Sequence, residues 1–168
     1  LSVHPTKGPI SGNTLIKIVL TNGTFSRIKP PNTFCFFGQD SQPTFAWEES
    51  LSCYSPAVFE SGRVPFQLGS RPQNPVRSLF AFEYYIDVHI QSIVPSHGSL
   101  RGGTSVSIIG NGFQASNLLC KFKENLGNNF VKYSSSTLVM CASPASTSIG
   151  TVSVEISNND GVDFTSEG

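Results

Sequence analysis

The chain has 168 residues, which is enough for one domain or two small ones. Its formal net charge is zero, with 11 basic and 11 acidic residues, so the basic surplus of a protein that binds phosphate backbones is absent. Hydrophobic residues make up 38% of the sequence and Phe alone counts 13, a composition that argues against a disordered chain and can fill two modest cores.

Short β-strands are predicted from the beginning of the chain onward. Residues 15–20 are mostly aliphatic, residues 64–68 alternate apolar with polar or small side chains, and residues 79–85 carry aromatic side chains in alternation. In the second half, residues 105–109 and 152–156 show related patterns. A period of two marks a half-buried strand, and no window of useful length shows helical periodicity. Strand candidates about every ten residues, separated by turn residues, predict an all-β chain of antiparallel sandwiches.

An internal repeat is the strongest signal in the sequence. Residues 5–18 return at 95–108 with Pro, Gly, Gly, Thr and Ile in register. Residues 52–57 correspond to 140–145, and each of these segments contains Cys-x-Ser-Pro. The offset between corresponding positions changes by only a few residues, as expected when loops of different length join equivalent strands.

The repeat predicts a first domain at 1–87 and a second at 88–168. Nothing in the second half corresponds to the aromatic strand at 79–85, so we expect the second domain to lack its last strand and to be truncated at its C-terminal end. Two explanations are open. The strand lies downstream in a longer chain, or another chain or segment supplies it by strand addition.

Glycine and proline mark the same places in both halves. Gly12 and the pair Gly102–Gly103 precede a strand at positions where a turn requires a positive φ. Pro5 and Pro95 follow the first strand of each half and should end its pairing, because proline has no N–H to donate. The two halves are therefore predicted to share one backbone plan.

Four cysteines form one pair in each half, Cys35 with Cys53 and Cys120 with Cys141. An even number divided in this way predicts two local disulfides. Loops of this size would each contribute roughly 3 kcal/mol to stability in the chain-entropy model. Disulfides persist in oxidising compartments. The alternative is a cytosolic protein with four buried thiols.

These motifs resemble the IPT/TIG family. The resemblance rests on Pro-x-x-Gly, Gly-Gly-Thr, Ile-Ile-Gly-Asn-Gly-Phe, Cys-x-Phe and Cys-x-Ser-Pro, and it extends over nearly the whole chain, twice. The first half departs from it at residues 20–25, where one extra residue interrupts the Ile-Gly-Asn-Gly-Phe element. The family implies immunoglobulin-like sandwiches of the E-set type, which occur in Rel-type transcription factors, plexins, receptor kinases and large surface proteins. The cysteine pair is similar to that of the extracellular members.

No motif for catalysis, cofactor binding or metal binding was found. Residues 158–163 are rich in oxygen ligands but lack the spacing and closing Glu of an EF-hand loop, so they predict a hairpin turn. Glu48 and Glu49 are adjacent, which suits surface residues better than acid–base partners. The histidines form no metal-ligand motif: His4, His89 and His97. We therefore expect no enzymatic activity and no cofactor.

Two surface features remain. Asn22 begins an Asn-Gly-Thr sequon and is predicted to carry an N-glycan on a turn. Three aromatic residues, Trp47, Tyr54 and Phe59, could form a surface for a protein or sugar partner, but we expect most of them to pack within a sandwich.

Taken together, these features favour a non-catalytic interaction or structural module of a cell-surface or secreted protein, such as an adhesion molecule, a receptor ectodomain or a surface filament. Its partners would be neighbouring repeats or other surface proteins, without nucleic acid or membrane contact. One alternative is an accessory module of a secreted carbohydrate-active enzyme, which requires a catalytic domain elsewhere. The other is a dimerisation or DNA-binding module of a transcription factor, which requires basic loops and reduced cysteines. Fold alone does not decide among them.

Overall fold

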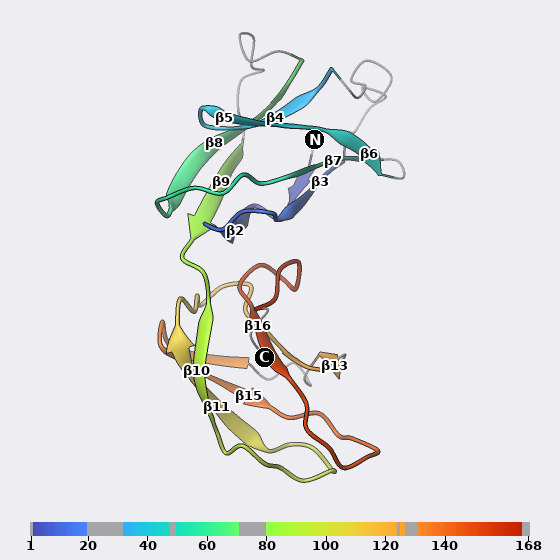
Figure 1. Ribbon diagram of the computed structural model, residues 1–168, viewed down its shortest axis with the longest axis vertical. Coiled ribbons are helices and arrows are strands. Elements are labelled where there is room, and N and C mark those ends of the chain that lie inside the picture. Colours follow the sequence, from blue (N-terminus) through green and yellow to red (C-terminus); the bar gives the residue numbers. More distant parts are fainter. Residues whose placement is uncertain are drawn as a thin grey trace. The chain divides into compact units, whose positions relative to one another are not determined.

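The computed structural model describes residues 2–19, 32–47, 50–70, 80–123, 125–126 and 131–165. These residues contain β-strands and no helix, which confirms the prediction of an all-β chain. The chain divides into two compact units, Leu1–Ile86 and Asp87–Gly168, and each is described by itself below. The arrangement of strands in each unit is shown in Figure 1.

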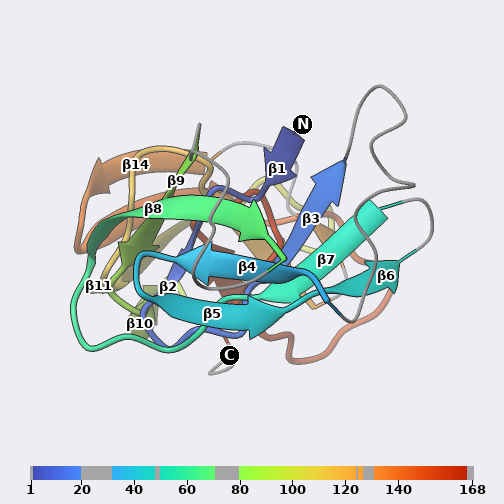
Figure 2. The same cartoon turned by 90° about the horizontal axis from the view of Figure 1, so that it is seen from above.

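The first unit is built from two sheets. Four strands form one sheet in the order β1 (Ser2–His4), β3 (Leu15–Val19), β7 (Ser50–Tyr54) and β6 (Phe45–Trp47). Five strands form the other in the order β2 (Lys7–Pro9), β9 (Phe80–Tyr85), β8 (Gly62–Gly69), β4 (Phe34–Phe37) and β5 (Asp40–Pro43). Figure 2 shows β8, β4 and β5 lying side by side. All strand pairs of this unit are antiparallel except β2 with β9.

Alternation along the strands places the core of the first unit between its sheets. In β3, Ile16 and Ile18 are fully buried whereas Lys17 is exposed. From the other sheet, Phe66 and Phe82 enter the same cluster. Phe37 packs edge-on against both rings, with centroids 5.2 Å away in each case. Burying each such side chain stabilises the fold by about 1.5–3 kcal/mol.

The second unit repeats this plan with fewer strands among its described residues. One sheet has the order β10 (His89–Val94), β11 (Ser105–Asn111), β15 (Leu138–Ala142) and β14 (Val131–Ser135). The other has the order β13 (Asn125–Leu126), β12 (Leu119–Phe122) and β16 (Val154–Ser157). Ile108 and Val139 from the first sheet and Phe122 and Ile156 from the second share one core.

Most predicted strands coincide with observed ones. Residues 105–109 lie within β11 and residues 64–68 within β8. The predicted strand at 152–156 is partly wrong, because β16 begins at Val154 and Val152 is an exposed residue of the preceding loop. Strands β1 and β10 end directly before Pro5 and Pro95, as the missing proline N–H requires.

The end of the described chain returns to β16. After the turn that follows β16, the Thr165 N–H donates to the Ile156 carbonyl at 3.0 Å. The Thr165 hydroxyl in turn accepts from the Ile156 N–H at 3.1 Å. By its pairing with the first cysteine strand, Ile156 corresponds to Leu68 of the first unit, two residues beyond Phe66, where β8 pairs with the beginning of β9.

Candidate interaction sites

Each unit contains one disulfide that joins its two sheets. Cys35 of β4 is bonded to Cys53 of β7, and Cys120 of β12 is bonded to Cys141 of β15. The Cα atoms are 6.5 Å apart in both pairs. All four side chains lie in the core, with 3% or less of their surface exposed. The bonds therefore tie sheet to sheet within a unit, at equivalent positions of the repeat.

In the first unit, the turn that precedes β3 is hydrogen-bonded to the loop that follows β7. The Asn13 N–H donates to the Ser55 carbonyl at 2.8 Å, and the Ser55 N–H donates to the Thr14 carbonyl at 3.0 Å. The Ser55 hydroxyl accepts from the Thr14 N–H at 3.1 Å. Gly12 has a φ of 76°, and a Cβ on it would lie 2.5 Å from the Ala57 nitrogen. Only glycine fits both the backbone angle and the space.

The second unit repeats this arrangement almost atom for atom. The Gly103 N–H donates to the Ser143 carbonyl at 2.8 Å, and the Ser143 N–H donates to the Thr104 carbonyl at 2.9 Å. The Ser143 hydroxyl accepts from the Thr104 N–H at 3.2 Å. Gly102 has a φ of 75°, with the Ala145 nitrogen 2.5 Å from a Cβ built on it. We call each arrangement a serine–threonine bridge, formed by Ser55 with Thr14 and by Ser143 with Thr104.

The serine–threonine bridges explain why two motifs recur in both halves of the sequence. The glycines were predicted to need a positive φ, and their φ values confirm it. The sequence did not show that the Gly-Thr element and the Cys-x-Ser-Pro element bond to each other. Their repetition in both halves was the signal that could have suggested it.

Two aromatic residues that we expected to be covered are exposed. Phe59 is fully exposed on the loop before β8, and Tyr54 is 43% exposed on β7. The expectation that most of these aromatics pack within a sandwich is therefore wrong for both. Tyr54 is stacked on Phe45 of the neighbouring strand, with ring centroids 5.5 Å apart. The side chain of Trp47 lies outside the part of the chain that the structure describes.

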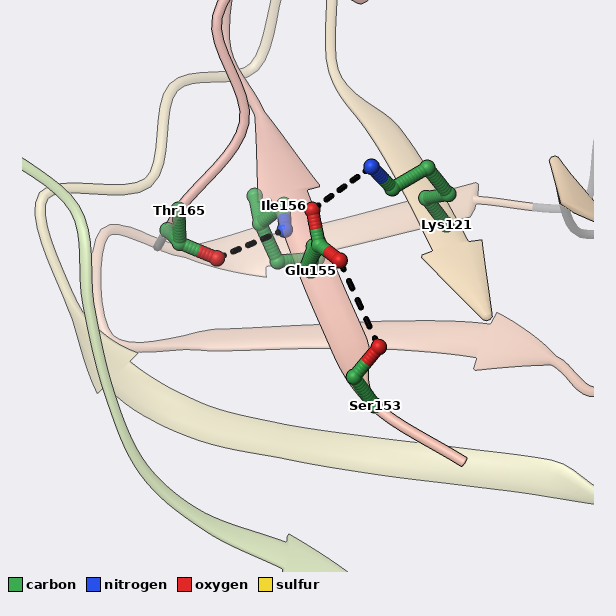
Figure 3. Close-up of polar contacts among 5 residues, drawn as sticks. All are labelled: Lys121, Ser153, Glu155, Ile156 and Thr165. Carbon is green, nitrogen blue, oxygen red and sulfur yellow. Dashed lines mark hydrogen bonds and ion pairs between the residues drawn. The ribbon is translucent and has the colours of Figure 1, made fainter. Parts of the chain in front are cut away.

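The outer side of the β12–β16 pair carries a polar cluster (Figure 3). Lys121 Nζ lies 2.7 Å from Glu155 Oε2, with about a fifth of each side chain exposed. The Ser153 hydroxyl donates to Glu155 Oε1 at 3.3 Å. Lys121 Nζ also lies 4.4 Å from the centroid of the Phe164 ring, within the range of a cation–π contact. The cluster joins β12, β16 and the returning segment 160–165.

Residues 158–163 form a turn, as predicted, and its polar groups bond to one another. Asp160 and Gly161 have φ values of 60° and 84°, as in the tightest hairpin turns. Asn159 is 1% exposed and bonds through its side chain to the Asp163 N–H at 2.9 Å and to Asp163 Oδ2 at 2.8 Å. No group of three or more metal-ligand side chains occurs among the described residues, here or elsewhere.

Asn158 is a buried polar residue that sequence reasoning did not single out. Its side-chain amide donates to the Gly112 carbonyl at 2.8 Å and its Oδ1 accepts from the Gln114 N–H at 3.1 Å. It is 1% exposed. One side chain thus satisfies two backbone groups of the loop between β11 and β12. An asparagine in a run of turn residues gives no signal of this role.

Tyr84 carries a polar atom without a partner in the core of the first unit. Its side chain is 2% exposed, and among the described residues its hydroxyl has no hydrogen-bond partner. Burial, followed by the nearby negative charge of Asp40, raises the pKa of Tyr84 above its ordinary value. Such a hydroxyl weakens the core unless something else bonds to it.

The remaining residues singled out in the sequence are three histidines and three residues that lie outside the described part of the chain. The three histidines are exposed and lie apart in the chain, on β1, on β10 and in the loop that follows β10. Asn22, and also Glu48 and Glu49, lie outside the described residues, so the glycosylation site stays a prediction. The described residues include no helix of the length and apolar character that a membrane crossing requires.

Fold and sites together define a chain of two immunoglobulin-like β-sandwiches, each with one disulfide between its own two sheets. Residues 89–168, nearly all of the second unit, match the model of the IPT/TIG domain family. Comparison with curated protein sequences gave no significant match.

Two solved structures to which the chain is similar have low sequence identity to it. One is described as the Plexin A4 full extracellular region, domains 1 to 10, with a TM-score of 0.55, 17% identity and coverage of 96% of this chain and 15% of that one. Another crystal form of the Plexin A4 full extracellular region, domains 1 to 8, gives a TM-score of 0.47 at 16% identity, with coverage of 98% and 17%. The chain thus spans about a sixth of the length of the structures it matches.

Proposed function

We propose that the chain is a non-catalytic interaction and structural module of the extracellular part of a larger cell-surface or secreted protein. The observation that carries this proposal is the pair of disulfides at equivalent positions of two repeated sandwiches. Bonds of this kind persist in oxidising compartments and are rare in the cytosol. The likeness to an extracellular region supports the same location only through the fold.

We propose two modules, at 1–87 and 88–168, and extend the IPT/TIG assignment of the second to the first. The support for this extension is the shared sequence landmarks and the serine–threonine bridge present in both. In this reading Asn22 is glycosylated, and the partners are neighbouring repeats or other surface proteins. The exposed Phe59 and the Tyr54–Phe45 stack are the side chains in the first module best suited to such contacts.

The test is the intact mass of material from its native source, measured with and without reductant and with and without a glycosidase. We expect a gain of about four hydrogens on reduction, since each disulfide takes up two, and loss of a glycan from Asn22. Free thiols together with an unmodified Asn22 would refute an extracellular module. Binding to DNA would then be the next measurement.

A further inference from the structure

We propose that the first unit is built to bear tension along the chain, through the parallel strand pair β2–β9. This inference rests on the structural side of the proposed function. It concerns a mechanical property of one module, which can be measured whether or not the partners are known.

The two strands belong to opposite ends of the first unit. Strand β2 lies near its beginning and β9 is its last strand, and the two pair in parallel with Lys7 opposite Glu83 and Gly8 opposite Tyr84. Hydrogen bonds flank this pairing on both sides. The Glu83 N–H donates to the Thr6 carbonyl at 2.9 Å, and the Ile10 N–H donates to the Tyr85 carbonyl at 2.8 Å.

Parallel pairing decides how a pulling force acts on these bonds. Tension applied to the two ends of the unit pulls β2 toward its own beginning and β9 toward its own end, so the strands are sheared past each other. In a parallel pair the hydrogen bonds run between the strands and are evenly spaced, so shear loads them together. An antiparallel hairpin pulled at its two free ends would instead open one bond at a time. The position of β9 beside β2, leading out of the unit, is visible in Figure 1.

Burial protects the same bonds from water. Lys7 is 8% exposed despite its charge, and Tyr84 and Tyr85 are 2% and 5% exposed. A Cβ on Gly8 would lie within 3.0 Å of Phe82 and closer still to Thr14, so β2 sits directly against the core and the serine–threonine bridge. Water therefore has little access to replace a bond that the force has stretched, and the bonds must break together.

On its other side β9 is held by β8. The pairing runs from Phe66–Phe80 to Gly62–Tyr84, and Arg63 Nε lies 3.2 Å from Glu83 Oε2 across it. Strand β9 is thus fixed between two neighbours. A force on the beginning of the chain first loads β1, which pairs with β3, and then β2.

The test is force spectroscopy on the whole chain, with a handle attached at each end. Glu83→Pro removes the N–H that bonds to Thr6, and we expect the rupture force of the first unit to fall to half or less. Two matched variants control for side effects. Glu83→Ala keeps the N–H and loses the ion pair with Arg63, and Ala81→Pro adds a proline on the same strand, outside the pairing with β2. Both should keep most of the force.

The rupture of the first unit is identified by its length. The bond between Cys35 and Cys53 prevents the chain between them, a sequence separation of 18, from extending. A Cys35→Ser, Cys53→Ser double variant should therefore lengthen this event alone by about 60 Å, at roughly 3.3–3.6 Å for each residue. Reduction would also open the bond between Cys120 and Cys141 and so lengthen the event of the second unit as well.

A second pulling direction needs no destabilising variant. Here one handle is attached at position 61 through Ser61→Cys, and the other stays at the C-terminal end of the chain. Because Gly62 lies opposite Tyr84, this force peels β8 from β9 instead of shearing β2 against β9. We expect a rupture force several-fold lower. Equal forces in both directions, or equal losses in Glu83→Pro and Ala81→Pro, would overturn the proposal. Free native cysteines would refute the extracellular location and leave this result standing, so the two proposals fail separately.

Discussion

Adjacent glycines in the second unit provide a sharp test of the serine–threonine bridge. Gly102 and Gly103 have nearly equal φ values, 75° and 73°, so an alanine at either position meets the same left-handed backbone penalty. The space around them differs. A Cβ on Gly102 would lie 2.5 Å from the Ala145 nitrogen and 2.7 Å from the Pro144 carbonyl carbon, whereas a Cβ on Gly103 has nothing within 4 Å.

The expected cost follows from this difference. Gly103→Ala should destabilise the second unit by about 1–2 kcal/mol, the penalty of the left-handed conformation. Gly102→Ala carries the same penalty and also pushes the turn from the 143–145 loop. That movement breaks the three hydrogen bonds of the bridge, each worth about 1 kcal/mol. We therefore expect about 4–5 kcal/mol for Gly102→Ala.

Hydrogen exchange of the buried β11 and β15 amides measures this cost, because the free energy of opening can be followed in the second unit alone. The single tryptophan of the chain lies in the first unit, so its fluorescence monitors that unit as an internal control. Equal destabilisation by the two alanines would refute the reasoning, since close approach would then contribute nothing.

Three further predictions concern two single side chains and one disulfide. Tyr84→Phe should stabilise the first unit by about 1 kcal/mol in urea denaturation, because it removes a buried hydroxyl without a partner among the described residues. Because the pKa of Tyr84 is raised in the folded state, its phenol stays protonated there after the phenol of the unfolded chain has ionised. The free energy of unfolding of the first unit should therefore not depend on this residue's ionisation below about pH 10, the unfolded value, and should fall above it by up to about 1.4 kcal/mol per pH unit. Tyr84→Phe should not show this fall in stability above about pH 10. The same dependence of stability on pH in the variant and the parent chain would contradict the prediction. Asn158→Ala should cost about 2–3 kcal/mol by hydrogen exchange, because the Gly112 and Gln114 backbone groups lose their partner. Asn111→Ala, at an exposed position of β11, should cost under about 0.5 kcal/mol. Replacing Cys120 and Cys141 by alanine should lower the stability of the second unit by about 3 kcal/mol in calorimetry, for a sequence separation of 21. A loss below 1 kcal/mol would mean that the unfolded chain is not constrained by this bond.

Local pattern was enough to predict much of the fold. Strand β3 follows from its short run of mostly aliphatic residues, and the ends of β1 and β10 follow from the proline after each. These features depend on a few neighbouring residues, which a sequence displays directly. Each disulfide also pairs the two cysteines that one half of the repeat contains, and it joins one sheet of that unit to the other.

Features that depend on distant segments were not predictable in this way. The parallel pairing of β2 with β9 joins residues more than seventy positions apart, and Lys7 gives no sign of being buried. The exposure of Phe59 was missed because an aromatic residue is usually read as core. Asn158 resembles any turn residue until its two bonds to the loop after β11 are seen. In each case the partner, and not the residue, determines the role.

The two units differ in what they place at one equivalent position, and this affects how they respond to salt. Lys121 follows the first cysteine of the second unit and is held by Glu155 and Phe164. Phe36 follows the first cysteine of the first unit and is 5% exposed. Added chloride salt screens a partly exposed ion pair, and strongly hydrated salts such as sulfate strengthen the burial of a phenylalanine. At this one position, chloride salt is therefore expected to weaken the contact in the second module, whereas sulfate is expected to strengthen the burial of the side chain in the first.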